Sequence, residues 1–167
     1  EVLYWCGVRE GELLALTPAD FDFEKRTVSI NKSYQRLNKQ DVITTPKTPK
    51  SNRVIQIPQF LCDELQDYLK QLYGVEPDSR MFPISKSYLH REMDRGCKQT
   101  GVKRIRIHDL RHSHISLLID MGFTALAIAE RVGHESIDIT YRYAHLFPTR
   151  QVEMADKLDL LKNEKGV

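Results

Sequence analysis

The chain has 167 residues, of which 41% are hydrophobic and 29% are charged, and these values are typical of one compact globular domain. No uncharged apolar run approaches the roughly 18 residues that a membrane-spanning helix needs, and the recurrence of Leu, Ile, Val and aromatic residues argues against disorder. The formal net charge of +2 leaves the kind of partner open.

The amino-terminal third predicts one helix followed by three strands. Apolar residues recur at helical spacing from Val2 to Leu16, and Thr17 and Pro18 stop the pattern. After an acidic turn, three short segments show strand-like alternation, namely 27–30, 42–45 and 53–57. We expect one three-stranded antiparallel sheet, with residues 46–52 as an exposed loop between its second and third strands.

Beyond Pro58 the periodic segments are helical, and Gly74, Gly101, Gly122 and Gly133 stand where helix-ending glycines are expected. The expected helices are 59–73, 85–100, 108–121, 124–132, 136–145 and 149–163. The predicted fold class is therefore mainly α with a small three-stranded antiparallel sheet.

The cysteines and the start of the chain point to a cytosolic protein. Cys6, Cys62 and Cys97 are odd in number and far apart, which favours reduced, packed thiols over a disulfide framework. The chain begins at Glu1 already in helical rhythm and shows no basic-then-apolar leader. We therefore expect no secretion signal here and further protein upstream of Glu1.

The charges are distributed unevenly along the sequence. Residues 36–53 hold five basic side chains and one acidic, and residues 90–111 hold seven basic and three acidic. Residues 1–30, by contrast, hold six acidic side chains and three basic. Two basic clusters on a nearly neutral body would give a positive face for an anionic polymer, although Lys and Arg also decorate ordinary solvated surfaces.

The densest polar cluster is HDLRHSH at residues 108–114. His108 and Arg111 share a helix face, and a guanidinium fork beside an imidazole suits a phosphate oxygen. These two side chains could instead satisfy neighbouring helix ends. Zinc binding by His108 and His112 is disfavoured, because no Glu directly follows the first histidine and no Cys lies close.

A tyrosine near the carboxyl end is a candidate nucleophile. Tyr143 lies nine residues after His134, and Tyr141 lies two residues before it. A phenol has an ordinary pKa near 10, so a nucleophilic tyrosine needs cations that stabilise the phenolate. Considered alone, both tyrosines could simply be packing aromatics.

Two further polar segments lie in the amino-terminal third. Arg9 follows a glycine and stands one helical turn before Glu12, a spacing typical of a surface salt bridge. TPKTPKSNR at 45–53 is a basic loop stiffened by prolines, whose lysines could reach a phosphate or give up a proton, or could belong to a solvated turn.

In this order and spacing, four segments resemble the catalytic domain of the tyrosine recombinases: GVREGELLAL, TPKTPKSNR, HDLRHSH and GHESIDITYRYAHL. The chain looks most similar to phage and integrative-element integrases of the lambda-integrase type, from Glu1 to about Phe147. The resemblance implies a catalytic domain over 1–148 and a tail helix over 149–167 that docks on a neighbouring subunit or packs on its own domain. It also implies core-binding and arm-binding domains outside this chain, without which the chain would bind DNA weakly and recombine poorly.

The resemblance implies a role for several of the polar residues. Arg9 matches the first catalytic arginine, and Glu12 matches the acidic residue that holds it. Lys47, with Lys50 as the alternative, matches the hairpin lysine that protonates the leaving 5′-oxygen. No metal or other cofactor is implied, because fixed cations neutralise the phosphate.

The remaining matches lie in the helical part of the chain. His108 and Arg111 match the HxxR pair, and His134 matches a later His or Trp position. Tyr143 matches the nucleophile that forms a 3′-phosphotyrosyl bond, whereas Tyr141 would face about 200° away on a helix.

The function implied is site-specific DNA recombination, with integration or excision of a mobile element through a Holliday junction and without ATP. The implied partners are double-stranded DNA with attachment-type sites, further copies of the chain in a tetramer, an excisionase and a DNA-bending host factor, with no membrane. The implied location is the bacterial cytoplasm, on the nucleoid when bound to DNA. A non-catalytic DNA-binding regulator and a topoisomerase-like nicking-closing enzyme are the alternatives.

Overall fold

The computed structural model describes residues 1–46, 48–146 and 151–165, and it begins with two short helices where the sequence predicts one. Helix α1 spans Val2–Trp5 and α2 spans Glu10–Ala15. Between them Gly7 has a left-handed φ of +62°, and a Cβ there would lie 2.4 Å from Cδ2 of His114. The expected single helix over 2–16 is therefore wrong, because the backbone turns where His114 packs against it.

The predicted three-stranded antiparallel sheet is confirmed, but one of its predicted strands is wrong. A three-stranded antiparallel sheet has the order β1-β2-β5, with β1 at Phe21–Asp22, β2 at Thr27–Ile30 and β5 at Arg53–Gln56. The expected strand 42–45 belongs instead to β4, Gln40–Thr44, which pairs with β3, Ser33–Leu37, in a separate two-stranded sheet. The β3–β4 hairpin is thus inserted between the paired strands β2 and β5.

The β3–β4 hairpin turns on Asn38 and Lys39, whose φ values of 49° and 65° are both positive. Such a pair of residues suits a two-residue type I′ turn. Tyr34 is the buried residue of β3, its hydroxyl donates to Asp41 at 2.9 Å, and the Arg80 guanidinium lies 4.2 Å from the centre of its ring. Arg80 also pairs with Asp41 of β4 at 3.3 Å, so one arginine joins both strands of the hairpin to the body.

In the described ranges, six helices follow the sheets: α3 Gln59–Gln71, α4 Lys86–Thr100, α5 Asp109–Asp120, α6 Ala125–Val132, α7 Ile137–Tyr141 and α8 Gln151–Lys165. The predicted helices match these within a few residues, with one exception. The segment 136–145 is split into α7 and a 3₁₀ turn at Ala144–Leu146, where Tyr143 donates to the carbonyl of Thr140 at 3.0 Å and Leu146 to that of Tyr143 at 2.8 Å, both in the i→i−3 pattern of a 3₁₀ turn. A mainly helical chain with a small three-stranded antiparallel sheet is confirmed.

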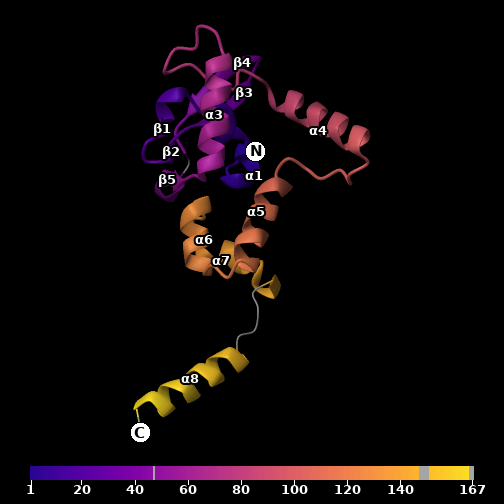
Figure 1. The fold of residues 1–167 in the computed structure, drawn as a ribbon. Helices are drawn as coiled ribbons and strands as arrows, with labels where there is room; N and C mark the ends of the chain where they lie inside the picture. Colours follow the sequence, from indigo (N-terminus) through magenta and orange to yellow (C-terminus); the bar gives the residue numbers. More distant parts are fainter. Residues whose placement is uncertain (47, 147–150, 166–167) are drawn as a thin grey trace.

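The largest apolar cluster joins α1, α2, the three-stranded sheet and α3, and it includes the fully buried Leu16, Ile55 and Leu61. A second cluster lies between α5 and α6 around Ile115 and Ile128. In Figure 1, α5, α6 and α7 lie together at one end of the part formed by residues 1–71, and α8 stands apart. Helix α1 contacts α5 and strand β5 contacts α6, so both clusters belong to one body.

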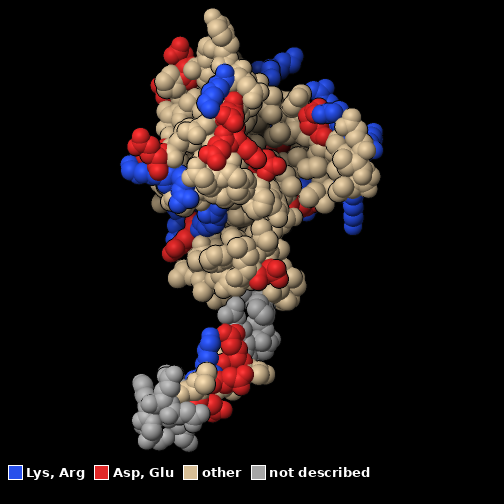
Figure 2. All heavy atoms as spheres, viewed as in Figure 1, with Lys and Arg blue, Asp and Glu red and all other residues tan. Residues whose placement is uncertain are grey.

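Charged side chains of both signs are scattered over the face of the molecule in Figure 2. On the face in Figure 2, acidic and basic atoms lie next to one another and do not separate into one basic patch. The acids of residues 90–111 each pair with an arginine: Arg95 with Glu92 at 2.5 Å, Arg104 with Asp94 at 2.8 Å and Arg106 with Asp109 at 2.9 Å. Among the described residues, no helix is both long and apolar enough to cross a bilayer.

Candidate active site

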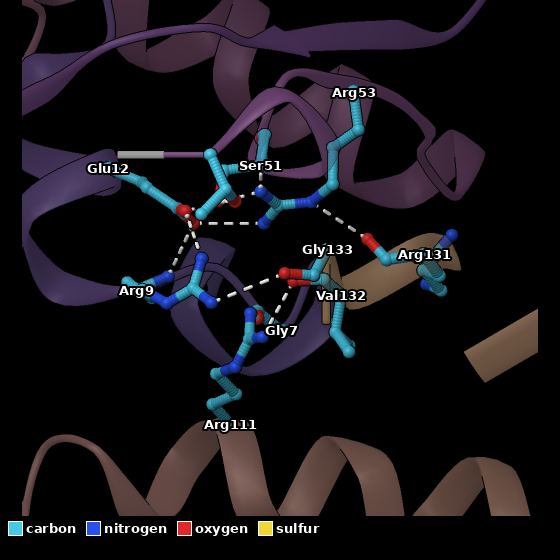
Figure 3. Close-up of polar contacts among 10 residues, drawn as sticks. Gly7, Arg9, Glu12, Ser51, Arg53, Arg111, Arg131, Val132 and Gly133 are labelled. Carbon is cyan, nitrogen blue, oxygen red and sulfur yellow. Dashed lines mark hydrogen bonds and ion pairs between the residues drawn. The ribbon is translucent and has the colours of Figure 1, made fainter. Parts of the chain in front are cut away.

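The carboxylate of Glu12, 4% exposed, is shared by two arginines (Figure 3). It accepts from Nη1 of Arg9 at 2.7 Å and from Nη2 of Arg53 at 2.9 Å. Arg9 directly precedes α2, and its backbone N–H also donates to Glu12 at 2.8 Å, which caps the helix. Burial opposes the charged form, but Arg53 and Arg9 together hold the pKa of Glu12 below its ordinary value. The ionised carboxylate therefore fixes both guanidinium groups.

Three consecutive carbonyl oxygens at the end of α6 each accept from a different arginine (Figure 3). Arg53 donates to the carbonyl of Arg131 at 3.0 Å, Arg111 to that of Val132 at 2.6 Å and Arg9 to that of Gly133 at 3.3 Å. The last carbonyls of an α-helix have no partner inside the helix and form the negative end of its dipole, so they attract cations. We call Arg9, Arg53 and Arg111, together with Glu12, the arginine cluster.

Arg111 is the most deeply placed cation of the cluster. Its side chain comes from α5, the residue is 3% exposed, and its second hydrogen bond, at 2.5 Å, goes to the carbonyl of Gly7 in the turn between α1 and α2. Burial, followed by repulsion from Arg9, lowers the pKa of Arg111 to about 9, so it stays protonated at neutral pH. Carbonyl oxygens carry only partial charge, so the positive charge of Arg111 remains available to an anion.

Arg53 belongs to the cluster although the sequence assigns it no role. Its side chain is 6% exposed and also donates to the carbonyl of Ser51 at 3.0 Å. A Cβ on Gly133 would lie 3.0 Å from Cδ of Arg53, so the glycine leaves room for the guanidinium group. The strand pattern holds the missed signal: Arg53 shares a strand face with Ile55, which is buried, so its side chain points inward.

His134 follows the three carbonyls directly and is 8% exposed. Its Nδ1 is hydrogen-bonded to Oγ1 of Thr140 at 2.8 Å, which leaves Nε2 as the ring nitrogen for a ligand. Burial, followed by the positive charges of Arg111 and Arg9, lowers the pKa of His134 to about 4. At neutral pH this side chain is an uncharged imidazole beside the arginine cluster.

Tyr143 lies between α7 and the 3₁₀ turn, and its ring packs against the cluster of α5 and α6. Its hydroxyl is hydrogen-bonded to Nδ1 of His112 on α5. Burial raises the pKa of Tyr143, with Arg111 and Arg142 acting in the opposite direction. Tyr141, by contrast, is 52% exposed. We call His112 and Tyr143 the tyrosine pair.

His108 precedes α5 and lies edge-on to His112, with ring centres 4.7 Å apart. Burial, followed by the neighbouring charge of His112 and then Arg111, lowers the pKa of His108. The pKa of His108 is therefore lowered by one member of the tyrosine pair, His112, and by one member of the arginine cluster, Arg111. The sequence assigned His112 only to a disfavoured zinc site, yet it is the side chain that touches Tyr143.

Lys47 lies outside the described residues. The alternative lysine, Lys50, donates to the carbonyl of Glu135 at 2.9 Å. The loop residues on either side of Lys47, Pro46 and Thr48, line a hollow of about 370 Å³ that Arg9 also lines. The side chain of Arg9 is 40% exposed, so one member of the arginine cluster reaches solvent.

The structure brings together most of the side chains that the sequence singled out. Arg9, Glu12 and Arg111 meet at the end of α6, next to His134. Among the described residues, His112 is the hydrogen-bond partner of the Tyr143 hydroxyl, and no arginine of the cluster bonds to it. In this structure Arg111 therefore acts on the Tyr143 hydroxyl through its charge rather than through a hydrogen bond.

The two histidines of α5, His112 and His114, contact different side chains and do not meet at one site. His114 is buried against Gly7, and its Nε2 accepts from Nε of Arg131 at 3.1 Å, away from the tyrosine pair. In the ranges that the structure describes, no group of three His, Cys, Asp or Glu side chains is placed to hold a metal ion.

Comparison with known proteins gives one family. The model of the Phage integrase family matches residues 1–150. The chain is 38% identical to the ICEBs1 integrase of Bacillus subtilis (strain 168), over 95% of the chain and 47% of that protein. It is 31% identical to the integrase of Staphylococcus phage L54a, over 96% of the chain and 51% of that protein. The chain thus spans about half the length of these curated relatives.

Solved structures share the fold. The Tn1549 transposon integrase, in complex with circular intermediate DNA, aligns with a TM-score of 0.79 and 20% identity over 96% of the chain and 57% of that protein. The XerH site-specific recombinase, bound to its difH substrate in a pre-cleavage complex, aligns with a TM-score of 0.64 and 25% identity over 92% of the chain and 42% of that protein.

Proposed function

The chain belongs to the phage integrase family, and on that basis we propose that it is the catalytic domain of a tyrosine-type, site-specific DNA recombinase. The observation that carries the proposal is the convergence of Arg9, Arg53 and Arg111 on three successive carbonyls, directly before His134. Guanidinium groups match the oxygens of a phosphate, and cations fixed in advance stabilise the charge that develops in its transition state. The domain comprises residues 1–148.

In the proposed reaction, Tyr143 is the nucleophile and attacks a scissile DNA phosphate. The bond from Tyr143 Oη to phosphorus forms, the bond from phosphorus to the 5′-oxygen breaks, and a 3′-phosphotyrosyl link joins chain and DNA. Arg9 and Arg111 bind the phosphate oxygens, with His108 and His134 as further donors. Because the link keeps the phosphodiester bond energy, a 5′-hydroxyl from another strand reverses the step without ATP.

Lys47 protonates the departing 5′-oxygen in this proposal. The Nζ of Lys50, the alternative, is engaged by the carbonyl of Glu135, which supports Lys47. The position of Pro46 and Thr48 on the wall of the hollow that Arg9 lines gives the same support.

The tail, residues 149–167, is proposed to dock on a neighbouring subunit of a tetramer. Its apolar side chains in α8 are exposed, with Val152 75%, Met154 50%, Leu158 67% and Leu160 60% exposed. Side chains of this kind are stabilised when a partner covers them.

The proposed substrate is double-stranded DNA with attachment-type sites, and the proposed outcome is integration or excision of a mobile element through a Holliday junction. Solved relatives are DNA complexes, which supports DNA as the partner. An excisionase, a DNA-bending host factor and a place in the bacterial cytoplasm, on the nucleoid when bound to DNA, complete the proposal.

A pool of duplexes with a randomised centre and a nick on one strand tests the proposal without presupposing a target sequence. Cleavage beside the nick releases a short fragment, so the covalent adduct cannot be resealed and accumulates. We expect an SDS-stable adduct with the wild-type chain and with Tyr141→Phe, and none with Tyr143→Phe. Sequencing the DNA of the adducts then gives the preferred site.

Each other outcome contradicts a defined part of the proposal. An adduct that persists in Tyr143→Phe overturns the choice of nucleophile. DNA binding that is lost with salt, without any adduct from the wild-type chain at concentrations that saturate the DNA, overturns catalysis and favours a DNA-binding regulator. Relaxation of a supercoiled plasmid without exchange between two selected sites favours a nicking-closing enzyme.

A further inference from the structure

The hydroxyl of Tyr143 and the ring of His112 are in direct contact, and nothing in the function proposed above uses this contact. His112 lies one helical turn after His108, the residue before α5, so the two rings are neighbours, and the ring of His112 also lies 5.8 Å from that of Tyr143. The ring of Tyr143 also packs against the apolar cluster of α5 and α6. The hydrogen bond to Nδ1 of His112 and this apolar contact therefore both fix Tyr143 next to α5.

We propose that His112 is the proton acceptor of the nucleophilic step, a catalytic residue in addition to those of the HxxR pair. The inference rests on the proposed function. As Oη of Tyr143 bonds to phosphorus, the Oη–H bond breaks and its proton passes to Nδ1 of His112. The 5′-oxygen leaves with the electron pair of the broken P–O bond and takes a proton from the lysine described above. In the reverse step, the imidazolium of His112 returns the proton to Oη.

The chemistry of the neighbouring groups favours His112 for this role. A guanidinium group has only donors, so the arginine cluster can stabilise a phenolate but cannot accept its proton. Burial raises the pKa of Tyr143, so a free phenolate is disfavoured and the proton must leave as the attack occurs. Within the described ranges, His112 is the side chain in hydrogen-bond contact with Oη that can accept that proton.

The charges around His112 come from three parts of the chain. On α5 itself the neighbours are His108 and the carboxylate of Asp109. From the turn after α6 comes His134, which is uncharged at neutral pH, and from the segment after α7 comes Tyr143. Asp109 offsets the imidazolium that the step creates, while its own salt bridge to Arg106 keeps it ionised.

The test measures the single-turnover rate of adduct formation on a nicked duplex selected from the pool. We expect His112→Ala to be slower by about 100-fold, the usual contribution of a general base, and imidazole in the buffer to restore part of that rate. His112→Gln keeps an acceptor oxygen that cannot hold the proton, so we expect a similar loss. His90→Ala removes a partly buried histidine on α4 whose Nε2 lies 3.5 Å from Glu10, and it should leave the rate within about twofold of wild type.

The pH profile separates proton transfer from positioning. The wild-type rate should decrease as the pH is lowered, and His112→Ala should lack this decrease. A His112→Ala rate within about threefold of wild type at every pH overturns the inference. An imidazole-insensitive loss, with an unchanged melting temperature, overturns it as well, because it would show a positioning role. Failure of the proposed function would appear differently, as the absence of any adduct from the wild-type chain.

Discussion

The two halves of the proposed site are built in opposite ways. The arginine cluster is buried except for Arg9, and several hydrogen bonds join its members to one another and to the end of α6. The tyrosine pair is held by one side-chain hydrogen bond, and Tyr143 lies between a five-residue helix and a 3₁₀ turn. The comparison teaches that the groups proposed to bind phosphate are fixed by many contacts within the chain, whereas the proposed nucleophile is held by few polar ones.

Removing Arg111 should produce the largest effect, because this residue is the buried centre of the fixed half. We expect Arg111→Ala to reduce the rate of adduct formation by about 1,000-fold. Arg111→Lys keeps a positive charge but cannot donate to the carbonyls of both Gly7 and Val132, so we expect a loss of about 100-fold. Single-turnover rates on the selected duplex measure both. A wild-type rate in Arg111→Lys would show that the two hydrogen bonds of the guanidinium group are not needed. The arginine cluster would then not depend on fixed geometry more than the tyrosine pair does.

Breaking the shared ion pair tests how much the fixed half contributes to stability. Arg53→Gln leaves the buried Glu12 with Arg9 alone, and we expect the free energy of unfolding to fall by about 3–5 kcal/mol. Arg95→Gln is the matched control, since its partner Glu92 is in an exposed pair, and we expect a loss of at most about 1 kcal/mol. Equal losses of unfolding free energy, measured by urea denaturation, would mean that the buried ion pair stabilises the chain no more than a surface pair does.

The stability of Arg53→Gln should also depend on pH differently from that of the wild type. Despite the cost of its burial, the folded chain holds Glu12 below its ordinary pKa of 4.5. Its contribution to stability is therefore complete above that ordinary value and is lost as pH falls through the lower, folded value. In Arg53→Gln the folded pKa rises, so the loss should begin at a higher pH.

Substituting Gly133 should have a smaller effect and show whether the backbone of α6 also needs to be fixed. Gly133 and Gly101 both end helices with left-handed φ values, +68° and +72°. A Cβ at Gly101 meets no atom within 4 Å, so Gly101→Ala should cost only the backbone strain, about 1 kcal/mol. Gly133→Ala should cost about 2 kcal/mol, because its Cβ also crowds Arg53.

Rates of adduct formation complete this pair of variants. We expect Gly133→Ala to slow the reaction, because the carbonyls that hold the arginines shift, and Gly101→Ala to leave it unchanged. Identical stability and rates for both variants would show that the end of α6 tolerates displacement.

The sequence predicts the helices better than the turns and strands that connect them. Residues 85–100 and 124–132 combine apolar periodicity with a closing glycine, and the structure confirms both helices and both endings. Apolar spacing continues through Gly7, so periodicity alone could not reveal a break that depends on distant His114. Strand β3 was missed because its side chains are mostly polar and one, Tyr34, provides its burial.

The site shows the same division. Arg9, Glu12 and Arg111 could be singled out from local spacing, and the structure places them together. The inward position of Arg53 follows from its strand pattern, but its partner does not, because Glu12 lies 41 residues away and the contact depends on the pairing of β2 with β5. His112 was considered only as a zinc ligand, and its contact with Tyr143 depends on α5 lying next to the 3₁₀ turn Ala144–Leu146.

Mass spectrometry of the adduct tests the central claim most directly, because Arg142 separates Tyr141 from Tyr143 and trypsin places the two in different peptides. After nuclease treatment, we predict a phosphate-linked nucleotide on the peptide that begins at Tyr143. A nucleotide on the peptide that ends at Arg142, or on any other peptide, would contradict an active site built from the arginine cluster and the tyrosine pair.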